Sequence, residues 1–196
     1  MKSAKDVRRL TAVTGCLVAA GVTLLAGASV GPAAAQPRPV KTPAATDLVI
    51  PAELAVPAGN ERVAVLDAQG VQTYTCTDGA WTLLEPAATL WKKSDSRRRA
   101  IALHSRGPVW VSTVDGSAVN AAAVANAPKA ETIPQLLLKA NAHRGTGVFA
   151  EVSYIQRLDT KGGVAPAGSC ASDATEQVSV PYSATYVFYE ATAAAS

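Results

Sequence analysis

The sequence predicts a mainly β fold, either a single-domain β-sandwich or a closed barrel, with one disulfide. Short strand-like runs alternate with turn residues at the spacing of roughly 8–12 residues that is typical of all-β domains. The run over residues 182–189 alternates two sets of side chains along its whole length, as a strand with one buried face does. Two cysteines, Cys76 and Cys170, lie in the part of the 196-residue chain that carries these runs.

Between residues 63 and 124 the strand-like runs are separated by clear turn signals. Asp67-Ala68-Gln69-Gly70 predicts a hairpin between two runs, Asp78-Gly79 predicts a turn, and Asp115-Gly116 favours a type I′ hairpin turn. Expected strands span residues 63–66, 71–76, 80–84, 89–92, 101–104, 109–114 and 117–124.

Four further stretches extend the pattern towards the C-terminus. Residues 118–130 are rich in Ala and residues 136–138 are Leu; both compositions favour helix intrinsically, but stretches this short leave helix and strand open. The alternation over residues 148–155 predicts a strand with one face formed by Val148, Ala150, Val152 and Tyr154. In the last expected strand, one face is formed by Tyr182, Ala184, Tyr186 and Phe188.

The first 35 residues have the three parts of a secretory signal peptide. Four basic residues precede an apolar stretch over residues 10–30, and Gly31-Pro32 separates that stretch from Ala33-Ala34-Ala35. We expect cleavage before Gln36 and a secreted, extracellular protein. The rival interpretation is a transmembrane anchor, since about 20 apolar residues span a bilayer. This stretch is rich in Gly, Thr and Ala and ends at a cleavage pattern, so no stable membrane insertion is expected after cleavage.

Removal of this leader changes the charge and the cysteine count. The chain has 18 basic and 15 acidic residues, of which four and one lie within residues 1–35, so the remainder carries 14 of each. This balance gives no support to a nucleic-acid partner. Residues 36–47 contain three prolines and predict a flexible tether, and residues 48–196 are expected to form one β-rich domain. Cys76 and Cys170 are then left to pair in an oxidising compartment.

His104 and Asp115 are the candidates for catalysis. With Ser117 they supply the residue types of a base, an orienting acid and a nucleophile, although Asp115-Gly116-Ser117 also has the composition of a turn. No G-x-S-x-G elbow is present, and His104 and His143 are 39 positions apart, without the short spacing of metal ligands. Neither G-x-G-x-x-G nor a P-loop motif occurs. We therefore expect no metal and no nucleotide cofactor.

One cluster of charge stands out between two expected strands. Lys92-Lys93 and Arg97-Arg98-Arg99 follow Trp91 closely. Such a cluster can hold an acidic polymer, for example a cell-wall polyanion, and an adjoining aromatic residue strengthens that interpretation. The alternative is a solvated hairpin loop. The binding candidates here are Trp91, Arg97, Arg98 and Arg99.

A series of short motifs runs in a fixed order through residues 48–190. The motifs are Gln72-x-Tyr74-x-Cys76, Gly107-Pro108-x-Trp110, Asp115-Gly116-Ser117, Ile133-Pro134-x-Leu136-Leu137-Leu138, Ile155-Gln156-Arg157, Thr160-x-Gly162-Gly163-x-Ala165-Pro166 and Val180-Pro181-Tyr182-x-Ala184-x-Tyr186-x-Phe188-Tyr189. This order resembles a family of secreted bacterial and fungal proteins catalogued as a domain of unknown function. Some fungal members carry a malate dehydrogenase label, and this chain has no dinucleotide fingerprint to match it.

The resemblance implies no established activity, so the site candidates come from its polar motif residues. Once turn-makers and core aromatic residues are set aside, His104, Asp115, Gln156 and Arg157 remain, and Gln72 joins Gln156 and Arg157 as a binding candidate if its strand face points outward. We expect a non-enzymatic binding or surface-associated domain for a glycan or cell-wall ligand. The alternative is a secreted hydrolase or metal-dependent enzyme that uses His104 and Asp115. The oligomeric state is left open by the sequence.

Overall fold

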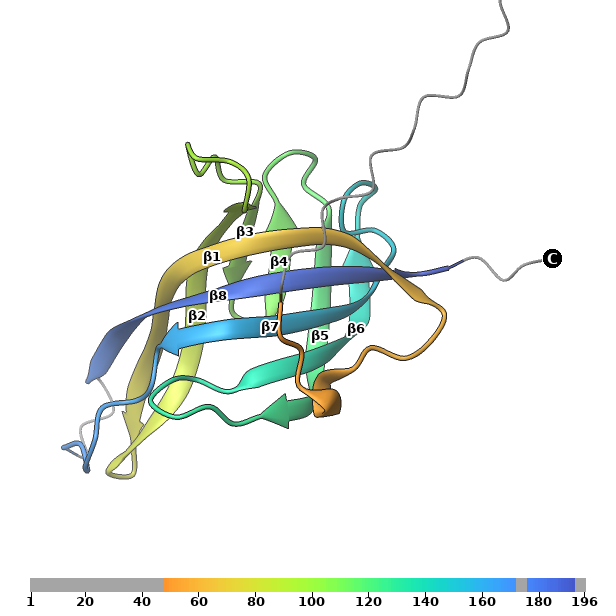
Figure 1. The fold of residues 1–196 in the computed structure, drawn as a ribbon. Helices are drawn as coiled ribbons and strands as arrows, with labels where there is room; N and C mark the ends of the chain where they lie inside the picture. Colours follow the sequence, from red (N-terminus) through yellow and green to blue (C-terminus); the bar gives the residue numbers. More distant parts are fainter. Residues whose placement is uncertain (1–47, 172–175, 193–196) are drawn as a thin grey trace, which may run out of the picture. The chain divides into compact units, whose positions relative to one another are not determined.

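The computed structural model describes residues 48–171 and 176–192, so the predicted leader and tether lie outside the described residues. Within these ranges eight antiparallel strands pair each with the next, and the last pairs with the first, which closes the sheet into a barrel (Figure 1). The strands are β1 (Asn60–Thr77), β2 (Ala80–Lys92), β3 (Ala102–Ser105), β4 (Val109–Ser112), β5 (Ala118–Ala127), β6 (Gln135–Arg144), β7 (Val152–Gly162) and β8 (Gln177–Ala191). A short 3₁₀ helix, η1 (Ala52–Leu54), precedes them.

The pairing of β1 decides between the two predicted forms of the fold. On β1, Gln72 lies opposite Pro86 of β2 on one side and opposite Val180 of β8 on the other. Closure of the sheet in this way satisfies backbone groups that an open sheet would expose at its edges. The mainly β prediction is therefore confirmed, and the architecture is the barrel. Among the described residues, no helix is long and apolar enough to span a membrane.

The two stretches that composition left open are both strands. The Ala-rich stretch forms β5, which pairs with β4 and β6, and the three leucines belong to β6. Helix propensity is a weak preference, and the cross-strand neighbours on both sides override it here.

The hairpin predicted at residues 67–70 is wrong, because β1 runs through this segment without a turn. Gly70 is opposite Ala88 of β2, and a Cβ atom at this position would collide with the backbone of Ala87 and Ala88. The glycine therefore allows two strands to approach closely, which is the second common reason for a glycine inside a strand. A glycine next to turn-forming residues therefore does not show from the sequence whether the chain turns there or two strands approach closely.

The strand predicted from residue 148 begins later, at Val152. The preceding residues form a turn that buries Phe149 and leaves Val148 exposed. A register shift between Val152 and Tyr154 then places Val152 in the interior core and Tyr154 beside the second, smaller core. The predicted common face is therefore wrong, because a bulge interrupts strict alternation.

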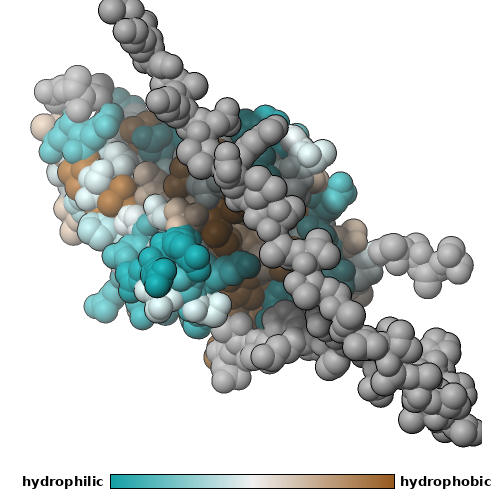
Figure 2. All heavy atoms as spheres, turned by 90° about the horizontal axis from the view of Figure 1, so that it is seen from above, coloured by the Kyte–Doolittle hydropathy of each residue, from teal (hydrophilic) through white to brown (hydrophobic). Residues whose placement is uncertain are grey.

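The main apolar core fills the interior of the barrel. All four residues of the predicted face of β8 are buried in it, and Tyr186 and Phe188 are fully inaccessible. Trp110 of β4 lies edge-on to both of these rings. In the view from above, hydrophobic residues are visible in the middle of the face, between strongly hydrophilic ones (Figure 2).

A second apolar cluster lies on the outer side of the wall, where the chain before β1 crosses it. Leu54 of η1 is fully buried against Leu137, Leu158 and Val187. On β8, Val187 alternates with the inward-facing Tyr186 and Phe188, which places it on the opposite face of the sheet. The N-terminal segment therefore covers part of the barrel wall from outside.

The predicted disulfide is confirmed. Cys76, near the end of β1, is bonded to Cys170, and their Cα atoms are 5.9 Å apart. Close by, the Tyr74 hydroxyl donates a hydrogen bond of 2.6 Å to the carbonyl of Gly163. Both contacts tie the segment that follows β7 to the end of β1.

Candidate functional site

A pocket of about 320 Å³ opens into the barrel interior. It forms because β3 and β4 are only four residues long and the ladder between β2 and β3 covers residues 88–90 alone. Residues 83–86 of β2 therefore line the pocket instead of pairing with β3, and Pro86, which has no N–H to donate, is suited to this unpaired stretch. The lining residues are Gln72, Leu83, Leu84, Glu85, Pro86, His104, Pro108, Trp110, Ala123, Leu136, Leu138, Arg157 and Tyr186.

The pocket wall is mostly apolar and contains two nitrogen atoms that have no hydrogen-bond partner. Gln72 and Trp110 are each 1% exposed, and Gln72 Nε2 and Trp110 Nε1 have no acceptor among the described residues. A buried polar group that lacks its partner costs about 1–3 kcal/mol. Because folded proteins satisfy most such groups, two unsatisfied donors in the wall of one pocket need an explanation.

Arg157 supplies a positive charge to the same pocket. Its Nε and Nη2 atoms donate hydrogen bonds of 3.2 and 2.9 Å to the carbonyl of Pro134, which fixes the side chain at the pocket wall. A guanidinium carries five N–H groups, so these two bonds leave three for another acceptor. The charge acts on its neighbours, because it opposes the burial that raises the pKa of Tyr186.

His104 is buried and held in one orientation. Its Nδ1 lies 3.0 Å from the carbonyl of Val109, and its ring is stacked on Trp110 with ring centroids 4.2 Å apart. Since a carbonyl only accepts, the proton is on Nδ1 and the lone pair of the neutral ring is on Nε2. Burial lowers the pKa of His104 to about 4; the nearby Arg157 also lowers it, against the hydrogen bond to Val109, which raises it. The ring is therefore neutral at pH 7.

Asp115 lies in the turn between β4 and β5. Its carboxylate accepts hydrogen bonds from the Ser117 hydroxyl at 2.6 Å, from the Ser117 N–H at 2.9 Å and from the Val148 N–H at 3.0 Å. The Ser117 hydroxyl is the largest cause that holds the pKa of Asp115 well below its usual range. His104 pairs with Trp110 beside the β3–β4 turn, whereas Asp115 follows the other end of β4.

The structure does not bring Gln156 to the pocket. This residue lies on the outer side of the wall, where its Nε2 donates to the Leu54 carbonyl at 2.6 Å and its Oε1 accepts from the Tyr189 hydroxyl at 2.9 Å. Gln156 therefore joins η1 to the barrel.

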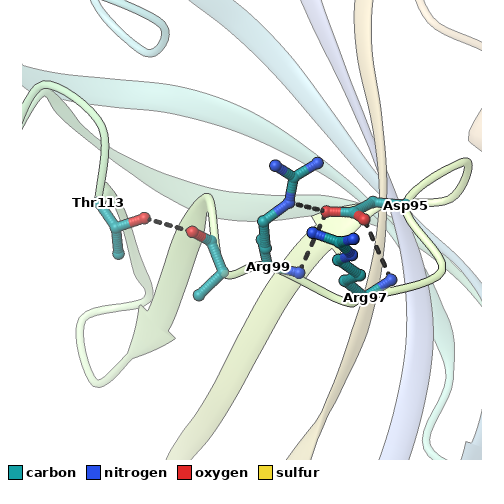
Figure 3. A network of polar contacts seen from close by, with 5 residues as sticks. Asp95, Arg97, Arg99 and Thr113 are labelled. Atoms are coloured by element: carbon teal, nitrogen blue, oxygen red, sulfur yellow. Dashed lines mark hydrogen bonds and ion pairs between the residues drawn. The ribbon is translucent and has the colours of Figure 1, made fainter.

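The three arginines of the charged loop have different surroundings. Arg99 pairs with Asp95, its Nε 2.8 Å from Oδ2, and Asp95 also accepts from the backbone N–H groups of Arg97 and Arg99 (Figure 3). Arg98 turns the other way, with its guanidinium carbon 5.2 Å from the centre of the Trp91 ring. The loop is therefore folded around Asp95, and Arg98 is the arginine that contacts the predicted aromatic partner.

Sequence reasoning placed His104 and Arg157 among the candidates, and Gln72 on the condition that it faces outward. The structure brings all three to one pocket, but Gln72 is buried on the inner face of β1, so the predicted outward orientation is wrong. It set Trp110 and Tyr186 aside as core aromatic residues. Their share in the pocket follows from the short β3 and β4. The sequence predicted a strand of the length of β3, over residues 101–104, but a longer strand than β4, over residues 109–114. Within the described part of the chain, no group of three His, Cys, Asp or Glu side chains is arranged to hold a metal ion.

The fold and the site define a closed eight-stranded β-barrel protein with a partly polar interior pocket. A family model described as "Protein of unknown function (DUF3455)" matches residues 57–190, and the chain belongs to this family. This confirms the resemblance to a domain-of-unknown-function family. Neither the curated proteins nor the solved structures contain a match to the chain.

Proposed function

We propose that this protein binds a small molecule in the barrel pocket and that it does so without catalysing a reaction. The observation that carries this proposal is the pair of unsatisfied donors, Gln72 Nε2 and Trp110 Nε1, in the wall of one pocket. An acceptor group of a bound molecule that reaches these nitrogens would remove the cost of leaving them without a partner.

The architecture supports a ligand of this size. Barrels of eight strands have an interior that can hold one small ligand. The volume of about 320 Å³ lies at the lower end of the range for ligand pockets, which is roughly 300–1,000 Å³. Leu84, Leu136 and Leu138 would contact the apolar part of the ligand, and Trp110 offers a flat surface.

The polar groups favour a carboxylate as the head group of the ligand. Gln72, Trp110 and Arg157 all offer N–H donors, and a guanidinium forms paired hydrogen bonds with a carboxylate. His104 is neutral and its Nε2 only accepts, so the donors for the carboxylate come from Gln72, Trp110 and Arg157. Glu85 also lines the pocket, but it alternates with Pro86 along β2 and therefore belongs to the outer side of the strand.

The catalytic alternative has less support. A base needs its proton donor or acceptor within hydrogen-bond reach, and the contacts of Asp115 are with Ser117 and Val148, beyond the other end of β4 from His104. His104 is itself engaged by Val109 and Trp110. A neutral, stacked histidine in a pocket lined by donors suits recognition better than proton transfer.

We also propose that the protein acts outside the cell. The leader pattern of residues 1–35 predicts export, and the disulfide between Cys76 and Cys170 is compatible with an oxidising, extracellular compartment.

Calorimetric titration with matched pairs of small molecules tests the proposed function. Each pair consists of a carboxylate and its primary alcohol, from acetate and ethanol to eight-carbon and aromatic examples. We expect affinity to rise with apolar size until the pocket is full, and each carboxylate to bind more tightly than its alcohol. If no member of the series binds at millimolar concentration, the proposal is wrong.

Two matched variants locate the binding. Gln72→Leu removes an unsatisfied donor from the pocket, and Thr160→Val removes a hydroxyl that is equally buried and unsatisfied but does not line it. We expect Gln72→Leu to weaken carboxylate binding roughly tenfold and Thr160→Val to leave it unchanged. Equal affinity of both variants would place the ligand elsewhere.

A further inference from the structure

The outer wall of the barrel carries a second hollow, a groove of about 640 Å³ that crosses β2, β1, β8 and β7. It shares no lining residue with the interior pocket. From its floor, its charges and its aromatic wall we infer that this groove binds an anionic oligosaccharide, independently of the small molecule proposed for the pocket.

The floor of the groove consists of polar side chains in two rows across the strands. In one row Trp91 is opposite Asp67, which is opposite Thr185. In the other row Gln69 is opposite Ser183, which is opposite Lys161. The floor thus has a carboxylate and an amide on β1 beside two hydroxyls on β8, and such groups can exchange hydrogen bonds with the hydroxyls of a sugar chain.

Positive charges lie at both ends of these rows. Lys93 and Arg98, in the loop after β2, line one end, and Lys129 and Lys161 line the end near β7. Neighbouring strands are 4.7–4.9 Å apart, so the four strands from β2 to β7 span roughly 14 Å. The groove therefore suits an extended ligand with negative groups towards its two ends and neutral polar groups between them.

The cations of the groove are not neutralised by ion pairs, although Lys129 Nζ donates a 2.9 Å hydrogen bond to the carbonyl of Thr160. Asp67 and Asp159 also line it, but the ion pair of Asp95 and Arg99 is the only one within residues 48–171 and 176–192. The Asp67 carboxylate accepts a hydrogen bond from the Thr185 hydroxyl at 3.1 Å. Four cations and two carboxylates leave the groove with a net positive charge.

Arg98 and Trp91 form a preorganised wall at the β2 end. The guanidinium of Arg98 lies over the Trp91 ring and also donates a 3.2 Å hydrogen bond from Nη1 to Gln69 Oε1. Both contacts hold the arginine on the floor side of its loop, although its side chain is exposed. Two arginines of the loop over residues 92–99 therefore have different roles: Arg99 pairs with Asp95 within the loop, and Arg98 lines the groove.

The same features favour an oligosaccharide over a nucleic acid. Single-stranded nucleic acids are bound by several stacking aromatic residues and by cations along the whole backbone. The groove has one tryptophan, which cannot stack several bases, and its cations lie at its two ends instead of along its whole length. The groove also has carboxylates, which accept hydrogen bonds from sugar hydroxyls.

Binding of oligogalacturonate, a defined polyuronate, to the purified protein tests this inference. Neutral malto-oligosaccharide of equal length and a single-stranded oligothymidylate serve as comparison ligands at the same ionic strength. We expect the polyuronate to bind more tightly than either, and its affinity to fall as salt is added, because exposed charges are screened. No binding of the polyuronate, or tighter binding of the oligothymidylate, would overturn the inference.

Single charge removals locate the site. We expect Arg98→Gln and Lys161→Gln each to lower the affinity for oligogalacturonate roughly two- to fivefold, as for exposed ion pairs. Arg106→Gln removes an exposed charge that lines neither hollow and should have no such effect. Gln72→Leu should also leave polyuronate binding unchanged, so that the proposed groove site and the proposed pocket site are tested independently. An equal loss in Arg106→Gln and Arg98→Gln would mean non-specific attraction and overturn the site.

Discussion

Gln72 and Gln156 are both 1% exposed and belong to opposite sides of the barrel wall. Gln156, on the outer side, has partners for both ends of its amide: the Leu54 carbonyl and the Tyr189 hydroxyl. Gln72, on the inner side, has an amide nitrogen without a partner, next to a pocket. The glutamine amide is therefore hydrogen-bonded at both ends on the outer side, whereas on the inner side its nitrogen lacks a partner.

This difference shows how burial and hydrogen bonding together separate structural from functional polar residues. By burial alone the two glutamines would be given the same role, and their positions in sequence motifs made both of them binding candidates. The hydrogen-bond partners divide them, because a satisfied buried amide contributes to folding and an unsatisfied one opposes it. The outer region, which we call the N-terminal clamp, comprises Leu54, Gln156 and Tyr189; the inner region is the pocket.

The largest effect is expected in the clamp, from Leu54→Ala. Leu54 is fully buried between η1 and the outer face of the barrel, so its truncation should lower the free energy of unfolding by about 2–5 kcal/mol. Urea denaturation of the variant measures this loss. Ligand affinity at the pocket should not change, because Leu54 and the pocket lie on opposite sides of the wall. A variant with unaltered stability would show that η1 does not hold the barrel.

In the pocket, the largest expected effect is a pH dependence set by His104. Its pKa is about 4 in the folded protein and about 6.5 in an unfolded chain, so the unfolded state binds the extra proton first as pH falls. Stability should be complete above about pH 6.5 and should fall by on the order of 3 kcal/mol as the pH decreases to about 4.

Denaturation midpoints measured between pH 4 and 7 test this dependence. His104→Gln should flatten the slope in this window whatever its own stability, since the titrating group is gone. The pKa values of Asp95 and Asp115 are also lowered in the folded state. Any loss of stability through these two carboxylates occurs below their ordinary pKa values near 4, so it is separated in pH from the loss through His104. An unchanged slope in His104→Gln would show that His104 does not set the window.

Much of this barrel follows from the sequence, and the exceptions have physical causes. The alternation in residues 182–189 gave the inner face of β8 correctly, because a long strand with one buried face has a strong period of two. Gly70 misled the turn prediction, since close approach of strands and turn formation both require glycine. The Ala-rich β5 could not be recognised from local preference, because its neighbours β4 and β6 determine its state.

The candidate site was predictable in its residues but not in its assembly. Arg157 was identified as a polar motif residue left after core and turn residues were set aside, and Gln72 was included on the condition of an outward face, although it is buried on the inner side. That they meet at one pocket depends on the closure of β8 against β1, which is a long-range property of the chain. Gln156 was grouped with them because the face of β7 on which it lies depends on a register shift that the sequence does not mark.

Gln156→Leu tests the structural role of the fully hydrogen-bonded glutamine in the N-terminal clamp. The substitution keeps the size of the side chain while it removes the partners of the Leu54 carbonyl and the Tyr189 hydroxyl. We expect a loss of about 1–3 kcal/mol in the free energy of unfolding, because both groups are left without their bonds in a partly or fully buried setting. Thermal and urea denaturation report it, and a neutral result would mean that water replaces the amide at the clamp.

Gln72→Leu makes the same substitution in the pocket, and we expect it to raise the free energy of unfolding instead of lowering it. Leucine has about the volume of glutamine without the unsatisfied nitrogen, so the empty protein should become more stable by about 1–2 kcal/mol. Denaturation without ligand measures this gain, and denaturation with a bound carboxylate should reduce it, since the ligand stabilises the wild type more than the variant. Destabilisation in both conditions would show that Gln72 completes the structure as Gln156 does, and the distinction between clamp and pocket would then fail.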